Sequence, residues 1–147
     1  MSQTSKALHL PADPLIGHAL GGKYVIKRLI GRGGVGLVYL ADQLDVDREV
    51  VVKVLAPNWA DDDEALARFE REARRLSGLK HPNIVTMLDF GKEGRRAYLV
   101  MEYLQGESLS DYVERQGRLT LEEFVPIAAQ ILKGIGHTHS REMMVRD

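Results

Sequence analysis

A glycine cluster, a lysine in an apolar stretch and a glutamate in a charged stretch are the residues of this sequence that could act together chemically. The cluster is Gly31-Arg-Gly-Gly-Val-Gly36, which fits the spacing G-x-G-x-x-G. Lys53 lies in the apolar segment 49–55, and Glu72 lies in the Arg-rich segment that follows it. Glycines let backbone N–H groups approach an anion, and a carboxylate partner keeps a lysine charged and in place. Together these residues suit the binding of a phosphate-bearing ligand.

The residues after the glycine cluster narrow its role. A dinucleotide-binding fingerprint needs a helix at the third glycine, but Gly36 is followed by Leu-Val-Tyr-Leu, a strand-like sequence. The Gly-Lys-Ser/Thr ending of a P-loop is also missing. The cluster therefore joins two strands, either as a plain hairpin turn or as a flap that folds over phosphates.

Lys53 is expected to be at least half buried, because both faces of its strand are apolar; the alternative is an exposed lysine on an edge strand. A buried ammonium needs a carboxylate partner, since it loses its hydration. On the predicted helix 64–79, Glu72 falls on the apolar stripe, whereas Glu70 lies about 200° away around the helix and is expected to face solvent. The spacing predicts a Lys53–Glu72 ion pair. The alternative is a Glu72 that reaches past the buried face to water.

Hydrophobic periodicity predicts the elements that position these residues. Thr120-Leu-Glu-Glu123 has capping-box spacing and marks the start of the last helix. Residues 1–20 show little pattern and are expected to be a flexible extension. The predicted strands are 24–30, 37–41, 49–55, 84–90 and 97–103, and the predicted helices are 64–79, 109–116 and about 120–139.

Composition excludes several classes of protein. The 147 residues are 44% hydrophobic and 28% charged, as in a globular domain. Twenty Lys+Arg against 21 Asp+Glu leave no basic excess for nucleic acid or an anionic membrane, so no nucleic-acid partner is expected. The absence of cysteine excludes disulfides, a thiol nucleophile and a Cys-based metal site. The sequence has no signal peptide, and its apolar runs are much shorter than the about 20 residues that a membrane-spanning helix needs. A cytoplasmic location is therefore expected.

Six segments of the sequence belong together as a pattern: Ile30-Gly-Arg-Gly-Gly-Val-Gly-Leu-Val-Tyr39, Val50-Val-Val-Lys53, Arg68-Phe-Glu-Arg-Glu-Ala73, His81-Pro-Asn-Ile-Val85, Leu99-Val-Met-Glu-Tyr103 and Val145-Arg-Asp147. Their order and spacing are those of the protein kinase family, and over about residues 24–147 the sequence resembles bacterial serine/threonine kinases of eukaryotic type.

The resemblance implies an α+β fold. Residues 21–104 would form a kinase N-lobe, a five-stranded antiparallel sheet plus one helix, together with the hinge. Residues 105–147 would be the first helices of an incomplete helical C-lobe. The apolar face of helix 120–139 would then be exposed and would offer a docking surface for a partner.

The resemblance also implies an ATP site. The glycine loop would cover the phosphates, Lys53 would contact the α- and β-phosphates, and Glu72 would hold Lys53. Asp147 would be the catalytic aspartate that accepts the proton of the substrate hydroxyl. The residues expected to bind ATP are Lys53, the loop residues Gly31, Arg32, Gly33, Gly34, Val35 and Gly36, the adenine walls Ile30, Val38 and Val51, the gatekeeper Met101, and the backbone of Glu102 and Leu104.

Three features depart from the family pattern. Val51 replaces the usual alanine and narrows the adenine slot, and Val145 replaces the histidine of His-Arg-Asp, which leaves Asp147 to take the proton. The asparagine and the Asp-Phe-Gly segment expected after Asp147, which supply the Mg²⁺ ligands in the family, do not follow.

The sequence thus predicts a partial kinase domain that binds ATP and belongs to an enzyme that phosphorylates protein serine or threonine. By itself the chain is expected to be inactive, because the protein ligands of Mg²⁺ are missing. The alternatives are a non-catalytic nucleotide-binding or interaction module, resembling a pseudokinase, and a gene relic. The sequence does not indicate which protein is the substrate.

Overall fold

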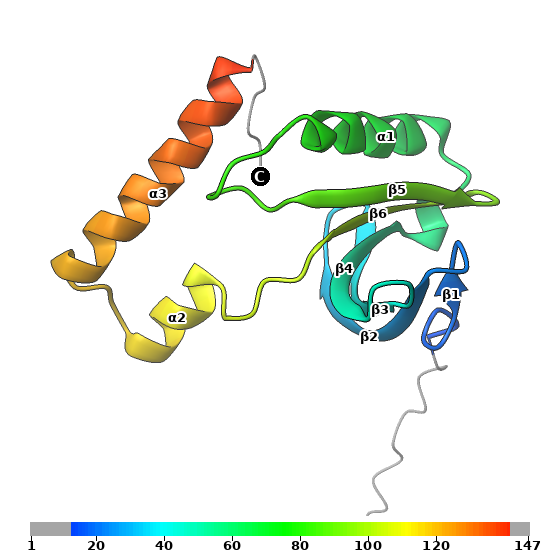
Figure 1. Cartoon of the computed structure of the whole chain (residues 1–147), viewed down its shortest axis with the longest axis horizontal. Coiled ribbons are helices and arrows are strands. Elements are labelled where there is room, and N and C mark those ends of the chain that lie inside the picture. The colour runs from blue at the N-terminus through cyan, green and yellow to red at the C-terminus, as the bar shows by residue number, and fades with distance from the viewer. Residues whose placement is uncertain (1–12, 142–147) are drawn as a thin grey trace, which may run out of the picture.

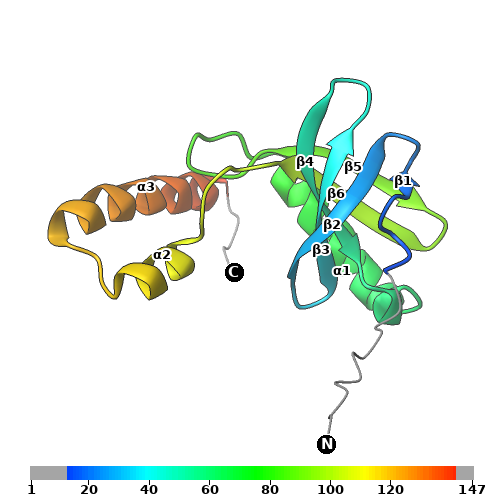
Figure 2. The ribbon, with the colours of Figure 1, turned by 90° about the horizontal axis from the view of Figure 1, so that it is seen from below.

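The structure, a computed structural model, describes residues 13–141, and its core is a six-stranded antiparallel sheet with the strand order β1-β2-β3-β4-β6-β5. Helix α1 lies along the β5–β6 side of the sheet, and α2 and α3 lie to one side of it (Figures 1 and 2). The elements are β1 (Ala19–Leu20), β2 (Tyr24–Arg32), β3 (Gly36–Gln43), β4 (Arg48–Leu55), a short 3₁₀ helix (Pro57–Trp59), α1 (Asp63–Ser77), β5 (Met87–Glu93), β6 (Arg96–Glu102), α2 (Leu109–Gln116) and α3 (Leu121–Ser140).

The two faces of the sheet carry separate hydrophobic cores, because side chains alternate along each strand. One face packs against α1, and the core between them contains Leu55, Ala97 and Leu99 of the sheet and Phe69 of the helix. The other face, which we call the inner face, buries Leu15, Leu20, Tyr24, Ile26, Tyr39, Ala41, Val50, Val52, Val54, Tyr98 and Val100.

All five predicted strands are present, as β2 to β6, and the two-residue β1 adds a sixth at the edge. β5 begins at Met87, later than the predicted start at residue 84. The reason is a turn before the strand, in which the Ile84 N–H donates to the His81 carbonyl at 3.0 Å. The apolar pair Ile84-Val85 therefore belongs to the connection and not to the ladder.

The prediction of a flexible extension over residues 1–20 is wrong for its described part, residues 13–20. Leu15 and Leu20 are 5% and 0% exposed and lie in the inner-face core. The sequence signal was weak because the segment contains one proline and one glycine around two short apolar pairs, so it shows no strand or helix period.

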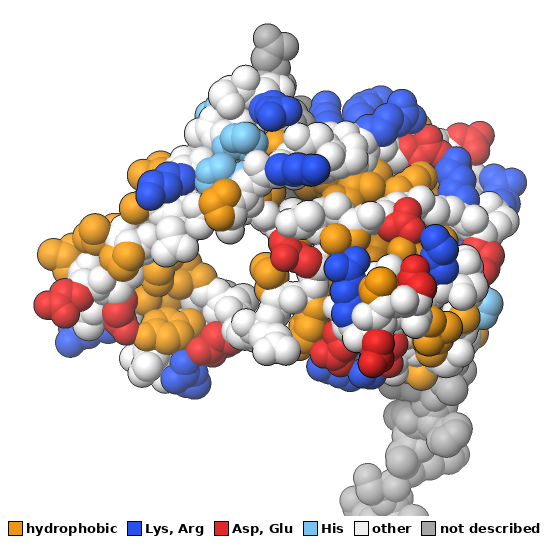
Figure 3. All heavy atoms as spheres, viewed as in Figure 1, with side chains coloured by type: hydrophobic (Ala, Val, Ile, Leu, Met, Phe, Trp, Pro, Cys, Tyr) orange, Lys and Arg blue, Asp and Glu red, His pale blue; other side chains and the backbone are white. Residues whose placement is uncertain are grey.

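α3 begins at the predicted capping box, in which Thr120 and Glu123 bond each other's backbone. The helix leaves much of its apolar surface in solvent, as predicted: Leu121 is 75% exposed and Leu132 67%. Figure 3 shows hydrophobic side chains gathered over α2 and α3. Among residues 13–141, no helix is both long enough and apolar enough to cross a membrane.

Candidate functional site

The strand register places the predicted adenine walls and Lys53 on one face of the sheet. Val38 on β3 is paired with Lys53 on β4, and Val51 on β4 is paired with Met101 on β6. Residues directly opposite each other in a ladder project to the same side. This is the face that packs against α1, because Met101 packs on the cluster that contains Phe69.

Lys53 and Glu72 form the predicted ion pair: the Lys53 Nζ donates to the Glu72 Oε1 at 2.8 Å. The lysine side chain is 20% exposed and the glutamate side chain 42%. The Nζ also lies 5.9 Å from the centre of the Phe69 ring, which adds a weak cation–π contact. The lysine side chain is therefore held in place and mostly buried, while the glutamate side chain remains partly open to water.

α1 presents Glu72 to the sheet because its buried stripe fixes how the helix is turned. Ala65, Phe69 and Ala73 are the buried residues of α1, and their four-residue spacing keeps them on one face. The helix begins at a strong cap: the Asp62 carboxylate accepts from the Glu64 and Ala65 N–H groups at 2.9 and 3.0 Å.

The prediction that Glu70 faces solvent is wrong. Its side chain is 22% exposed and forms ion pairs with Arg74, at 3.2 Å, and with Lys92 of β5. The Lys92 ammonium, as the largest cause, lowers the pKa of the Glu70 carboxyl. Helical geometry gave the angle between Glu70 and Glu72 correctly, but it could not show that β5 lies under that flank of α1.

The glycine cluster forms a hairpin loop over the stem of Lys53. β2 ends at Arg32 and β3 begins at Gly36, and the Gly33 N–H donates to the Gly36 carbonyl at 2.8 Å. A Cβ on Gly36 would lie 3.3 Å from two carbons of the Lys53 side chain and 3.1 Å from the Val54 carbonyl oxygen. A side chain at Gly36 would therefore press on the β4 backbone and on the Lys53 stem, which gives a steric reason for glycine at this position.

The end of β6 and the segment that follows it carry the two predicted backbone contacts to adenine. The Glu102 N–H donates to the Thr86 carbonyl at 3.0 Å, and the Glu102 side chain accepts from the Thr86 N–H at 2.7 Å. The Glu102 N–H is therefore occupied, and its carbonyl is the group left to bind a ligand, since a carbonyl oxygen has two lone pairs. Leu104 is 62% exposed.

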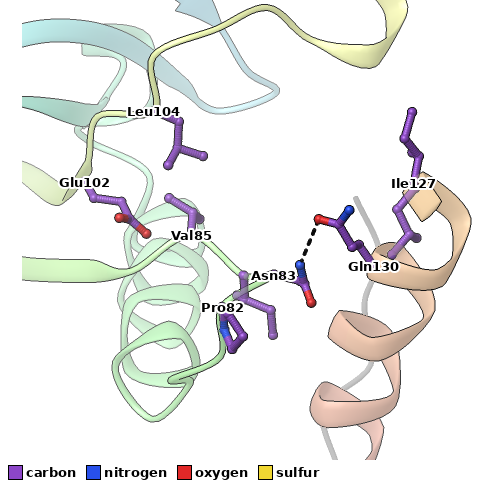
Figure 4. Close-up of a pocket in the computed structure, with 9 residues that line it drawn as sticks. Pro82, Asn83, Val85, Glu102, Leu104, Ile127 and Gln130 are labelled. Atoms are coloured by element: carbon purple, nitrogen blue, oxygen red, sulfur yellow. Dashed lines mark hydrogen bonds between the residues drawn. The ribbon is translucent and has the colours of Figure 1, made fainter. Parts of the chain in front are cut away.

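Glu102 and Leu104 also line a cavity of about 340 Å³ between the connection before β5 and α3 (Figure 4). Across it the Asn83 amide donates to the Gln130 side-chain oxygen at 3.3 Å, which joins the two parts of the chain. The lining residues include neither Lys53 nor the glycine hairpin, so this cavity is separate from the predicted phosphate site.

The remaining predicted site residues are Ile30 and Asp147. Ile30 is on β2 and 38% exposed, at the open edge of the site. Asp147 and Val145 lie outside the described residues. Sequence reasoning missed Leu99, which is fully buried opposite Lys53 in the ladder; its alternation with Met101 along β6 was the available signal.

An Asp-Phe-Gly tripeptide occurs in the chain at Asp89–Gly91, and its surroundings show a structural role. It lies in β5, where Asp89 is paired with Val100 and therefore points to the inner face, away from Lys53. The Asp89 carboxylate accepts from the Tyr24 hydroxyl at 2.6 Å. Within residues 13–141 no group of three or more His, Asp or Glu could hold a metal ion.

The sequence model of the protein kinase domain matches residues 24–147, which is most of the chain. This chain belongs to the protein kinase family. It is 44% identical to the serine/threonine-protein kinase PrkC of Bacillus subtilis (strain 168) over 133 residues, 90% of this chain and 20% of that protein. It is 38% identical to PknA, a serine/threonine-protein kinase of Mycobacterium tuberculosis (strain ATCC 25618 / H37Rv), over 140 residues, 92% of this chain and 32% of that protein.

Solved kinase structures resemble this one in three dimensions as well. The crystal structure of the M. tuberculosis PknI kinase domain superimposes with a TM-score of 0.71 at 28% sequence identity, and the match covers 85% of this chain and 51% of that chain. This kinase chain therefore spans about half of a solved kinase domain and less than a third of the curated relatives given above. The family assignment and the partial kinase fold predicted from the sequence are confirmed.

Proposed function

We propose that this kinase chain is the nucleotide-binding part of an ATP-dependent protein serine/threonine kinase. The observation that supports the proposal is the 2.8 Å Lys53–Glu72 pair beneath the glycine hairpin. A fixed, mostly desolvated ammonium binds phosphate oxygens strongly, because charge-assisted hydrogen bonds are stronger where water is excluded. In this proposal residues 21–104 form the nucleotide lobe with its hinge, and residues 105–147 begin the helical lobe.

Each group of the site has a defined task in the proposed reaction. The N–H groups of the glycine hairpin, residues 31–36, and the Lys53 ammonium hold the ATP phosphates, while Glu72 keeps Lys53 in place. Val38, Val51 and Met101, with the exposed Ile30, enclose the adenine, and the backbone of Glu102 and Leu104 binds its edge.

Asp147 is proposed as the base that accepts the proton of the substrate hydroxyl as that oxygen attacks the γ-phosphate, with ADP as the leaving group. Mg²⁺ serves the family by neutralising charge on the phosphates, and its family ligands, the asparagine and the Asp-Phe-Gly aspartate expected after Asp147, are not among these 147 residues. We therefore expect the 147 residues tested alone to bind ATP without transferring phosphate.

A second candidate function is a non-catalytic nucleotide-binding or interaction module. The observation in its favour is the apolar side of α3, where Phe124, Val125 and Ile131 are 51%, 56% and 47% exposed. We propose that further polypeptide covers this face. In the solved PknI kinase domain about half of the chain lies outside the match.

Binding of ATP to the purified 147-residue chain, followed by isothermal titration calorimetry, tests the proposal. We expect saturable binding of one ATP per chain, and binding within about twofold of wild type for Asp147→Asn, since the base contacts the substrate hydroxyl and not the nucleotide. Absence of binding by the folded chain would contradict the nucleotide site. Phosphate transfer to protein by the full-length kinase, lost in Asp147→Asn, would decide against the non-catalytic module.

A further inference from the structure

The segment of residues 13–20, which we call the N-terminal strap, precedes the part of the chain that matches the family and is nevertheless built into the sheet. The Gly17 N–H donates to the Ile26 carbonyl at 2.7 Å, and the Ile26 N–H donates to the His18 carbonyl at 3.0 Å. Both backbone groups of Ile26 on β2 are thus bonded to the strap, and the last two residues of the strap form β1, which pairs with β2. It is a part of the nucleotide lobe and not a leader to it.

A buried tyrosine is hydrogen-bonded to the first residue of the strap. Tyr39 of β3 is 0% exposed, and its hydroxyl donates to the Asp13 Oδ2 at 2.7 Å. The other carboxylate oxygen, Oδ1, accepts from the Leu15 N–H at 3.0 Å. A buried hydroxyl without a partner is strongly unfavourable, so Asp13 is the group that makes this position of a tyrosine possible. Burial, and secondly Asp13, raise the pKa of the Tyr39 hydroxyl, which therefore stays a donor.

Tyr39 lies at the centre of the three strands that carry the proposed ATP site. It is paired with Leu29 of β2 and with Val52 of β4. Side chains alternate along a strand, so the neighbours of these residues, among them Val38 and Lys53, project from the opposite face into the site. Whatever fixes Tyr39 on the inner face also fixes the strands on whose other face ATP would bind.

β2 is the strand that needs such support. Its pairing with β3 is shifted between Ile26 and Arg28 and again between Leu29 and Gly31. Bulges interrupt the ladder and bend the strand, so the ladder alone defines its position less well. The strap bonds Ile26, before the first shift, and Tyr39 meets Leu29, between the two shifts. Both attachments lie on β2 between its start and the glycine hairpin.

We propose that Asp13 is a positioning residue: through its hydrogen bond to Tyr39 it holds β2 and β3 so that the glycine hairpin stays over Lys53. The proposal rests on the proposed ATP site. Asp13 itself is bonded to Tyr39 on the inner face, on the opposite side of the sheet from the proposed nucleotide site.

Hydrogen exchange of the backbone amides of residues 31–38, measured on the whole 147-residue chain without nucleotide, tests this role. We expect about fivefold faster exchange there in Asp13→Ala and in Tyr39→Phe, with no further gain in the double variant, because the two groups share one bond. If Asp13→Ala does not fold, Asp13→Asn replaces it, since it keeps one oxygen for the Leu15 N–H.

Tyr24→Phe is the matched control. Tyr24 belongs to the same inner-face core, and its hydroxyl donates to the Asp89 carboxylate at 2.6 Å, but it lies at the far end of β2 from the glycine hairpin. If Asp13 only stabilises the fold, Tyr24→Phe and Tyr39→Phe should speed the amide exchange of residues 31–38 equally. This result would overturn the proposal.

The affinity for ATP gives a second readout. We expect about threefold to tenfold weaker binding in Tyr39→Phe and wild-type affinity in Tyr24→Phe. If the wild-type chain binds no ATP, the proposed function fails, while the exchange data still decide the role of Asp13. If wild type binds ATP and Tyr39→Phe binds it equally well, the positioning role fails and the ATP site stands.

Discussion

Replacing Lys53 with methionine is expected to weaken ATP binding by about 10- to 100-fold, the loss expected when a charged hydrogen bond to a phosphate is removed. Methionine keeps an unbranched apolar stem, so the packing under Gly36 is retained. Stability should fall by no more than about 1 kcal/mol, because the remaining Glu72 carboxylate is 42% exposed and can be hydrated. Titration calorimetry with ATP and thermal unfolding measure the two effects.

Lys27→Met is the matched control for this prediction. Lys27 also pairs with carboxylates, Glu49 at 2.9 Å and Asp42 at 3.2 Å, but its ion pairs are exposed. We expect unchanged affinity for ATP in this variant. Equal losses in Lys27→Met and Lys53→Met would show that general positive charge attracts the nucleotide and that Lys53 has no special role.

Glu72→Gln separates holding the lysine from binding the ligand. Because Glu72 acts through Lys53, we expect a loss of about threefold to tenfold in the wild-type background and no further loss in the presence of Lys53→Met. Additive losses in the double variant would mean that Glu72 acts on the nucleotide independently of the lysine.

Gly36→Val is expected to lower both stability and affinity. Valine favours strands by up to about 1 kcal/mol, but its Cβ would lie 3.1 Å from the Val54 carbonyl oxygen, and this backbone atom cannot move without opening the β3–β4 ladder. The steric effect therefore outweighs the strand preference of valine, and we expect a loss of about 1–3 kcal/mol in the free energy of unfolding. Displacement of the Lys53 stem, 3.3 Å from the same Cβ, should weaken ATP binding by about tenfold.

Gly34→Ala provides the comparison within the same loop. A Cβ on Gly34 would meet nothing within 4 Å, and Gly34 does not have a positive φ. We expect stability within about 0.5 kcal/mol of wild type and nearly unchanged affinity. If Gly34→Ala lowered stability and affinity as much as Gly36→Val, the loop would need glycine for flexibility throughout. The close contact between Gly36 and Lys53 would then not explain the losses in Gly36→Val.

The Lys53–Glu72 pair could be predicted because each partner is constrained locally. The apolar flanks of Lys53 require burial, and the spacing of α1 selects Glu72. Glu70 could not be placed in this way, since its partner Lys92 comes from a strand whose position depends on the whole sheet. A helical wheel gives relative angles on a helix but not what faces each angle.

The N-terminal strap was missed for a related reason. Its order comes from distant contacts, such as Asp13 with Tyr39 and His18 with Glu93, and not from its own periodicity. The late start of β5 at Met87 has a local cause, the turn at His81–Ile84, which the apolar residues of that stretch obscured. Pattern reasoning thus recovered the elements and the ion pair, whereas contacts between distant segments required the structure.

Affinity labelling of the lysines tests the central claim most directly. An adenosine analogue that carries an electrophilic sulfonyl fluoride in place of the phosphates reacts with amines held in the phosphate site, and mass spectrometry of the digested chain identifies the modified residue. The Lys53–Glu72 site predicts modification of Lys53 ahead of the exposed Lys27 and Lys92, and protection of Lys53 by excess ATP. Modification that is spread over the exposed lysines and insensitive to ATP would contradict a nucleotide site at Lys53.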